Sequence, residues 1–288
     1  MLDPVTQIKP SRISPILRHG GFAIGGGVLL LLVLIAIFAP LLAPHDPFVQ
    51  SLGERMKPPF WHDGMSPGHW LGTDQLGRDY LSRLIYGTQI SLVIGFGAVL
   101  ISGFIGISLG IAAGYFGGWV DTCINAVITT RLSLPVVLVA LAIVAVVGGS
   151  LTVVLLVIGL LLWDQFAVVA RTATQQLRNA EYVSAARAMG TTHMHVMIRE
   201  ILPNIRASLI VVATVEMANA VLIEAALSFL GLGVQAPLPS WGLMLSEAKN
   251  FMFFNPWLIT LPGLCLFALA LSINLLGDGL RDIQGEKR

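Results

Sequence analysis

The sequence is poor in charged residues. Lys, Arg, Asp and Glu make up only 11% of its 288 residues, whereas 55% are hydrophobic and the mean hydropathy is +0.80. Soluble globular domains carry about 25% charged residues, so this chain has too little charge to cover a water-facing surface. We therefore predict an integral membrane protein. Its formal net charge of +1 gives no reason to expect a nucleic-acid partner.

Motifs for catalysis and nucleotide binding are also missing. There is no GxxxxGKS/T phosphate loop, no HExxH and no CxxC, so we expect no enzyme activity and no cofactor bound by this chain. The two cysteines, Cys123 and Cys265, lie in apolar stretches and are expected to be packed thiols.

Histidines are few as well, and they do not form a metal-binding motif. His193 and His195 are two residues apart and would point to different sides of a helix. His45, His62 and His69 could in principle meet a metal, but their Pro-rich surroundings favour ordinary exposed histidines. We therefore expect no metal site.

Six long apolar segments are predicted to cross the membrane. A helix needs about 20 apolar residues to span a hydrocarbon core of about 30 Å, and no small-residue cleavage site marks the first segment as a cleaved signal peptide. The expected fold is all-α and polytopic. Its six transmembrane helices cover residues 22–42, 90–113, 124–147, 151–173, 207–230 and 257–277.

The positions of Lys and Arg predict the orientation of these helices. Basic residues gather in the N-terminal tail, in the loop before the fifth span and in the C-terminal tail, and loops rich in Lys and Arg stay in the cytoplasm. Both termini are therefore predicted to be cytoplasmic. The residues are Lys9, Arg12 and Arg18, then Arg171, Arg178, Arg187, Arg199 and Arg206, and finally Arg281, Lys287 and Arg288.

We divide the chain into two parts. Residues 1–86 hold the N-terminal tail, the first span and a long outer segment, and residues 87–288 hold the membrane core and the C-terminal tail. The outer segment ends in LGTDQLGRDYLSRLIYG, in which Asp74 is a helix-cap candidate. An apolar face that includes Tyr80 and Leu84, and an Asp79–Arg83 pair at i, i+4, predict a short helix on the outer membrane surface.

Small residues and a proline mark the second and third spans. Gly106, Gly110 and Gly114 recur every four residues, and this spacing lets helix backbones approach closely in lipid. Packing within the chain is favoured over a dimerisation face. In the third span, Arg131 is expected to snorkel to the cytoplasmic surface, and Pro135 is expected to kink the helix.

Carboxylates occur inside the predicted membrane core. Glu216 and Glu224 lie in the fifth span, where a charge must face protein or water. Either they line a transport path, or they make internal hydrogen bonds or lie near a helix end. Asp164 is expected at the membrane interface. The Gly/Pro-broken segment that follows the fifth span is predicted to be an outer gate or plug. It includes Gly231, Gly233 and Trp241.

The longest polar interruption in the second half reads EYVSAARAMGTTHMHVMIREILPN, from Glu181 to Asn204. A small-residue helix is expected to end at Gly190, where glycine permits a left-handed backbone conformation. A second short helix would then run into Pro203 and redirect the chain. Ala185 and Ala186 add little bulk, so we expect this turn to enter a groove of another protein.

Four stretches resemble one family. Ala185-Ala186, Gly190 and Ile201-Leu202-Pro203-Asn204 resemble the EAA motif of bacterial ABC-importer permeases. LGTDQLGRDYLSRLIYG, ALSFLGLGVQAPLPSWGLML and LLGDGLRD are similar to the C-type permease subunit of dipeptide and oligopeptide importers, the DppC/OppC class. The resemblance covers nearly the whole chain.

This resemblance implies a type I ABC-importer permease fold in the bacterial inner membrane. It also implies a second, B-type permease subunit, two ATPase subunits that bind ATP and Mg, and a periplasmic or lipid-anchored solute-binding protein, besides membrane lipid. The coupling loop would cover about residues 174–206. Its ATPase-coupling residues would be Glu181, Tyr182, Ala185, Ala186, Arg187, Gly190, Pro203 and Asn204.

Other functions remain open at this point. The same machine could carry nickel chelates, glutathione or another small solute. A secondary transporter would usually show internal repeats, and we find none between the two halves. An intramembrane enzyme would need a base within the spans, and no histidine lies in any of them.

Overall fold

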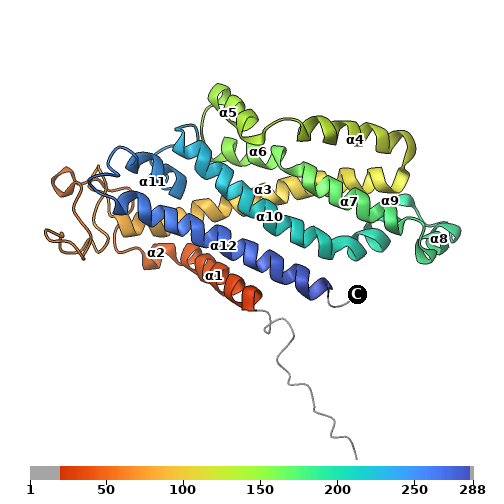
Figure 1. Cartoon of the computed structure of the whole chain (residues 1–288), viewed down its shortest axis with the longest axis horizontal. Helices are drawn as coiled ribbons and strands as arrows, with labels where there is room; N and C mark the ends of the chain where they lie inside the picture. The colour runs from red at the N-terminus through yellow and green to blue at the C-terminus, as the bar shows by residue number, and fades with distance from the viewer. Residues whose placement is uncertain (1–19, 286–288) are drawn as a thin grey trace, which may run out of the picture.

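The computed structural model describes residues 20–285 and consists almost entirely of helices (Figure 1). In this part of the chain the only β-type pairing is an isolated bridge between Thr73 and Asp79. The all-α fold is therefore confirmed. The basic tail residues Lys9, Arg12, Arg18, Lys287 and Arg288 lie outside the described residues.

The helices follow the predicted spans in order, and they agree in number if the bent α4–α5 pair is counted as one span. Five helical stretches of the described chain are long and apolar enough to cross a membrane, or six if the bent α4–α5 pair is one span. The elements are α1 Gly20–Ile37, α2 Ala39–Leu42, a 3-10 turn Leu52–Glu54, α3 Tyr80–Phe116, α4 Gly118–Leu132, α5 Val136–Val147, α6 Leu151–Leu161, α7 Trp163–Leu177, α8 Glu181–Ala188, α9 His193–His195, a π-helical turn Val196–Ile201, α10 Leu202–Phe229, α11 Trp241–Ala248 and α12 Trp257–Gly285.

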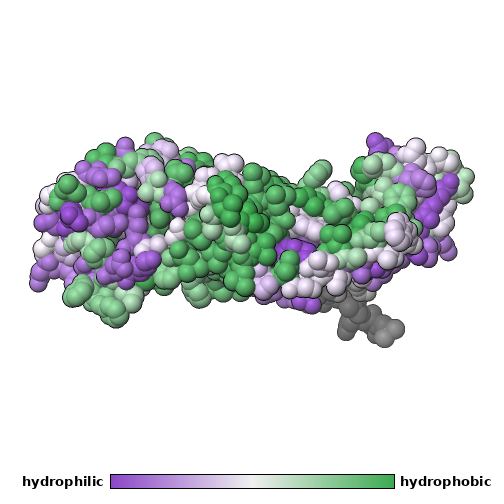
Figure 2. Space-filling view, turned by 90° about the horizontal axis from the view of Figure 1, so that it is seen from above, coloured by the Kyte–Doolittle hydropathy of each residue, from purple (hydrophilic) through white to green (hydrophobic). Residues whose placement is uncertain are grey.

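The bundle is elongated and has two polar ends. The outer segment and α11 lie at one end, and α8 and α9 lie at the other (Figure 1). Helices α1 and α12 run antiparallel, because Gly279 meets Phe22 at the start of α1. The start of α1 and the end of α12 therefore share one end of the bundle, and Figure 2 shows a hydrophobic belt between the two polar ends.

A glycine stripe joins α3 to α7. A Cβ atom added to each of the three glycines would come within 2.2, 2.5 and 2.6 Å of a backbone carbonyl oxygen of α7. Such contacts are too short for any side chain, so the stripe packs within the chain and is not left free for a dimer. The facing pairs are Gly106 with Trp163, Gly110 with Ala167, and Gly114 with Arg171.

This packing predicts a stability defect for Gly110→Ala. The new methyl group would meet the Ala167 carbonyl oxygen at 2.5 Å, and overpacking of this kind costs about 1–3 kcal/mol. Gly27→Ala in α1 is the matched control, because a Cβ atom there meets nothing within 4 Å. Thermal unfolding of both variants in detergent tests the prediction, and equal midpoints for the two would contradict it.

The predicted surface helix at residues 80–85 is wrong. These residues form the first turns of α3, which runs unbroken for 37 residues and contains the 86/87 boundary between our two parts. Tyr80 and Leu84 are buried in a core shared with α11 and α12 and do not face lipid. Asp79 caps α3 by accepting from the Ser82 N–H at 2.8 Å. Arg83 pairs with Asp74 and Glu247, so the expected Asp79–Arg83 pair is also wrong.

Two spans are interrupted at membrane depth. Helices α4 and α5 meet at an angle of 82°, with Pro135 as the residue that precedes α5. The predicted kink is thus a sharp bend. Helices α6 and α7 are separated at Leu162. Cys123, in α4, is exposed on the surface of the chain and is not the packed thiol that we expected.

The chain does not redirect at Pro203. Residues His193–Phe229 form one continuous helical stretch, with Pro203 in the first turn of α10. The π-helical turn Val196–Ile201 lies immediately before it. A π-helical turn interrupts the regular hydrogen bonds of the helix. The missing N–H of a nearby proline therefore disturbs the helix less.

Candidate functional site

Helix α8 projects at one end of the bundle and ends in a Schellman motif. The Gly190 N–H donates to the Arg187 carbonyl at 2.9 Å, and the Thr191 N–H donates to the Ala186 carbonyl at 3.3 Å. Gly190 has a φ of +77°, so the glycine ends the helix in the left-handed conformation that we predicted. No atom lies within 4 Å of the position that its Cβ would take.

The inner face of α8 is anchored to the chain itself. Val183 and Ala186 are buried in a core cluster with Ile111, Tyr115 and Val196. Ala186 therefore cannot enter a partner's groove, and that part of the expectation is wrong. It packs inward because it follows Val183 by three residues and so lies on the same helix face.

Charged and aromatic contacts fix α8 to the end of α3. The Arg187 guanidinium lies 4.5 Å from the centre of the Tyr115 ring. The Tyr115 hydroxyl is 2.9 Å from His193 Nδ1, at the start of the long helical stretch that leads into α10. Helix α8 is therefore in contact with α3 and, through Tyr115, with the helical stretch that leads into α10.

The outer face of α8 carries the groups available to a partner. Glu181, Tyr182 and Ala185 are exposed, as are Pro203 and Asn204 at the start of α10. Met189, at the tip of the turn, is 77% exposed. Sequence reasoning missed this methionine, although an apolar side chain beside the terminating glycine was a usable signal.

A polar pocket lies within the bundle, where the two interrupted spans meet α10. It has a volume of about 240 Å³ and is lined by Arg131, Asp164 and Glu216, together with Gln165 and Asn219. Asp164 and Glu216 are 5% and 2% exposed. Irregular backbone at this depth is tolerated where it lines a cavity, as the breaks beside Leu132 and Leu162 do here.

The Arg131 guanidinium donates hydrogen bonds to backbone carbonyls at these breaks. It donates to the Leu134 carbonyl at 3.3 Å and to the Leu161 carbonyl. Arg131 lies about 20 Å along α4 from the helix start, so the predicted snorkelling to the cytoplasmic surface is wrong. The interfacial position expected for Asp164 is also wrong, because Asp164 is buried in the first turn of α7, beside the same pocket.

The two glutamates of α10 have different surroundings. Glu216 lines the polar pocket, where Asn219 donates to one of its oxygens at 3.4 Å and the other oxygen has no partner. Glu224 is completely buried and accepts from the Ser228 and Ser240 hydroxyls at 2.7 and 3.0 Å. For Glu224 the geometry therefore favours the internal hydrogen-bond alternative.

The broken segment after α10 is firmly held. The Trp241 indole N–H donates to the Leu84 carbonyl at 3.0 Å, and its ring packs on Gly87 of α3. Gly231 takes a φ of +83°. Gly233 lies so close to Ser228 that a Cβ atom would meet the hydroxyl at 1.9 Å. The segment packs against the outer end of α10. Its role as a gate stays a prediction.

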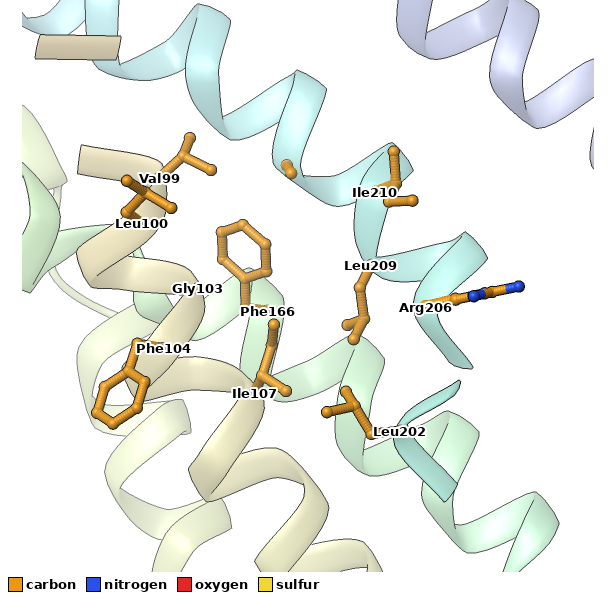
Figure 3. A pocket seen from close by; sticks show the side chains of 11 residues that line it. Val99, Leu100, Gly103, Phe104, Ile107, Phe166, Leu202, Arg206, Leu209 and Ile210 are labelled. Atoms are coloured by element: carbon orange, nitrogen blue, oxygen red, sulfur yellow. The ribbon is translucent and has the colours of Figure 1, made fainter. Parts of the chain in front are cut away.

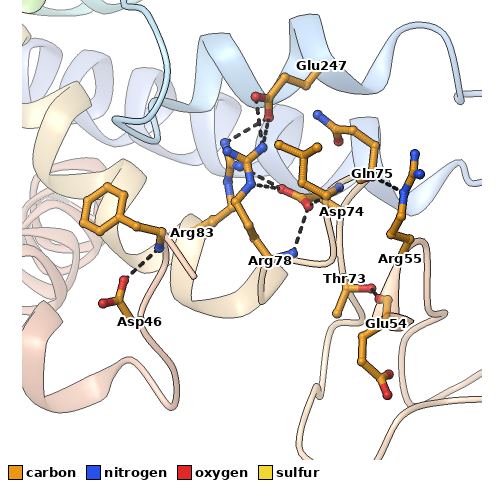
Figure 4. A network of polar contacts seen from close by, with 11 residues as sticks. Asp46, Glu54, Arg55, Thr73, Asp74, Gln75, Arg78, Arg83 and Glu247 are labelled. Carbon is orange, nitrogen blue, oxygen red and sulfur yellow. Dashed lines mark hydrogen bonds and ion pairs between the residues drawn. The ribbon is translucent and has the colours of Figure 1, made fainter. Parts of the chain in front are cut away.

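A buried ion network holds α11 to the outer segment (Figure 4). Arg78 Nε and Arg83 Nη1 lie 2.6 and 2.7 Å from Asp74 Oδ2, and both guanidinium groups also reach Glu247 of α11 at 2.9–3.1 Å. Burial raises the pKa of Glu247, and the neighbouring Arg78 opposes this shift. Three guanidinium hydrogen bonds lead us to expect an ionised carboxylate at neutral pH.

An apolar groove of about 500 Å³ runs along the side of the bundle between α3 and α10 (Figure 3). Phe166 of α7 forms its floor, and Arg206, the one charged lining residue, points away from it. The groove offers nothing to a polar solute. It suits lipid or the apolar surface of another membrane helix.

Comparisons with known proteins agree on one family. Residues 106–287 match the family described as binding-protein-dependent transport system inner membrane component, and residues 16–59 match the N-terminal TM domain of oligopeptide transport permease C. The dipeptide transport system permease protein DppC of Haemophilus influenzae is 42% identical over 92% of this chain and 90% of its own length. The di/tripeptide transport system permease protein DppC of Pseudomonas aeruginosa is 42% identical over 92% and 88%.

A third relative and a solved structure complete the comparison. The glutathione transport system permease protein GsiD of Pectobacterium atrosepticum is 38% identical over 92% of this chain and 87% of its own. An inward-facing structure of the MetNI methionine ABC transporter aligns with 72% of this chain and 97% of its own at 18% identity, with a TM-score of 0.56. This likeness confirms the predicted type I ABC-importer permease fold.

Proposed function

Because the chain belongs to the family of binding-protein-dependent transport system inner membrane components, we propose that it is the C-type permease subunit of an ATP-driven importer for dipeptides and oligopeptides. The observation that carries this proposal is the 42% identity to a dipeptide permease over 92% of the chain. The chain would lie in the bacterial inner membrane with both termini in the cytoplasm.

The partners follow from this function. Transport would need a B-type permease subunit, two ATPase subunits and an external solute-binding protein. ATP and Mg would bind to the ATPases, and this chain would carry no catalytic group. The apolar groove between α3 and α10 supports contact with lipid or with the second permease subunit, because its lining offers almost only hydrocarbon.

Coupling to the ATPases would run through α8. Its exposed face is free to dock on a partner, and its buried face packs on α3 and on the helix that leads into α10. Closure of the ATPases would therefore move α10, which extends from the coupling end to Glu216 and Glu224. Such a lever links ATP binding to alternating access without any chemistry in this chain.

The polar pocket is the proposed contact for the passing solute. Free peptides carry an ammonium and a carboxylate, and the pocket offers one guanidinium and two carboxylates. A hydrogen bond to a charged group contributes about 1.5–3 kcal/mol, and about 1.4 kcal/mol changes an equilibrium tenfold. We therefore expect Glu216→Leu to lower dipeptide uptake roughly tenfold or more, measured with labelled peptide in proteoliposomes.

Gln165→Leu is the matched control for this prediction. It removes a neutral side chain from the lining of the same pocket, so it alters shape and polarity without removing charge. Uptake by this variant should fall much less than uptake by Glu216→Leu, because the pocket keeps Arg131, Asp164 and Glu216. Equal rates for the Glu216→Leu variant and the wild type would remove the pocket from the transport path.

Glutathione is the second candidate solute, because a 38% identical relative is named as a glutathione permease. Competition decides between the two. Proteoliposomes with all partner subunits and the binding protein should take up a labelled dipeptide, and excess unlabelled dipeptides should suppress this uptake more strongly than glutathione does. The reverse order would assign glutathione to the system.

A further inference from the structure

Three side chains from separate turns of the outer segment converge at the start of α3. Ligand atoms of His45, His69 and Asp79 all lie within 4.8 Å of one another. Asp79 Oδ1 is 2.9 Å from His69 Nδ1 and 3.8 Å from His45 Nδ1. The sequence predicted three ordinary exposed histidines; two of them are instead brought together, while His62 lies against Trp257.

The spacing suits a small divalent cation. Metal–nitrogen and metal–oxygen bonds of about 2.0–2.2 Å in tetrahedral geometry place neighbouring ligand atoms about 3.3–3.6 Å apart. The two Asp79–histidine separations, 2.9 and 3.8 Å, lie on either side of this value. Small side-chain rotations that move the ligand atoms by a few tenths of an ångström would make these two distances equal.

Neighbouring groups orient the ligands, as they do in established metal sites. The Ser82 N–H donates to Asp79 Oδ2 at 2.8 Å, which leaves Oδ1 directed at the two histidines. The His45 N–H donates to the Ser82 hydroxyl at 3.1 Å. Ser82 therefore holds both the Asp79 carboxylate and the backbone of His45 in place.

The negative charge of the Asp79 carboxylate favours a cation between these three side chains. The Asp79 side chain is only 1% exposed, and a buried carboxylate is costly unless it is paired. Between Gly20 and Asp282, no Lys or Arg forms an ion pair with it, because the adjacent Arg78 and Arg83 are engaged by Asp74 and Glu247. The His45 side chain is 42% exposed, so ions have access.

We propose that His45, His69 and Asp79 bind one divalent transition-metal ion of the zinc type. Imidazole nitrogen and carboxylate oxygen are ligands for Zn²⁺, Co²⁺ and Ni²⁺. Three protein ligands leave at least one coordination position for water. The ion joins two points of the outer segment to the start of α3, beside the network of Arg78 and Arg83. It therefore fastens the outer segment to the membrane helices.

Cobalt titration of the purified complex, without a polyhistidine tag and after treatment with chelator, tests this site. The wild-type complex should bind one Co²⁺ more than His45→Gln or His69→Gln complexes, with visible absorption bands of a nitrogen- and oxygen-ligated ion that Zn²⁺ abolishes. Each variant should bind at least about tenfold more weakly. His62→Gln, from the same segment, should behave like the wild type.

The His69→Gln substitution keeps an N–H donor for Asp79, so the metal-free variant should unfold at the wild-type temperature. Added Zn²⁺ should raise the unfolding midpoint of the wild type and of His62→Gln but not of His69→Gln. Equal Co²⁺ binding by all four proteins, or no binding by any, would overturn the proposal and leave a hydrogen-bonded His–Asp pair.

Discussion

Replacing Gly190 with valine should reduce stimulation of the partner ATPases by roughly tenfold or more while the chain still inserts into the membrane. Gly190 has a φ of +77°, a conformation that costs an ordinary residue about 1–2 kcal/mol. Its missing side chain would point into open space at the tip of α8, where the partner is proposed to dock. Since about 1.4 kcal/mol changes an equilibrium tenfold, strain and bulk together suffice for this loss.

Gly118→Val is the matched control for this experiment. Gly118 also has a positive φ, +52°, and also has nothing within 4 Å of the Cβ position, but it lies at the start of α4. ATPase activity should be measured with binding protein and solute present, in complexes of equal subunit content. Gly190→Asn should retain more activity than Gly190→Val, because asparagine tolerates the left-handed conformation. Equal activity of the Gly190→Val and Gly118→Val complexes would remove the special role of α8.

Arg83→Met should destabilise the chain by about 3–5 kcal/mol. The Arg83 side chain is 1% exposed and lies 2.7 Å from Asp74 and 2.9 Å from Glu247. Its removal leaves the buried Asp74 carboxylate and the partly buried Glu247 carboxylate with one counter-charge fewer. Breaking a buried ion pair by removing one partner costs more stability than the intact pair contributes. We expect a lower thermal midpoint and easier proteolysis of the outer segment, since α11 and this segment lose a shared contact.

Arg55→Met serves as the control for this stability measurement. Arg55 is exposed and makes a single hydrogen bond from its side chain to the Gln75 carbonyl at 2.6 Å. Its loss should change stability by less than about 1 kcal/mol. Midpoints that fall equally in the two variants would show that the buried network carries no special weight.

The sequence predicted features that depend on local pattern. Span number follows from apolar length, the packing of Gly106, Gly110 and Gly114 from their four-residue spacing, and the end of α8 from glycine at position 190. Each property is set within a few turns of helix. The family resemblance likewise relied on contiguous motifs, and the comparisons confirm it.

Features set by tertiary packing were missed. Hydropathy treats residues 151–173 as one span, so it could not place the break at Leu162 or bring Asp164 to the pocket beside Glu216. The sequence pattern places the helix around Tyr80 on the outer membrane surface, because nothing local reveals that α11 and α12 cover its apolar face. His45 and His69 are 24 residues apart, and only the fold of the outer segment brings them to Asp79.

The energy source for uptake tests the central claim most directly. Proteoliposomes should contain this chain with its second permease subunit, both ATPases and the solute-binding protein, and should be loaded with either ATP or an ion gradient. We predict uptake of labelled dipeptide with ATP and none with proton or sodium gradients alone. Uptake driven by an ion gradient without ATP would contradict the importer function and the coupling role of α8.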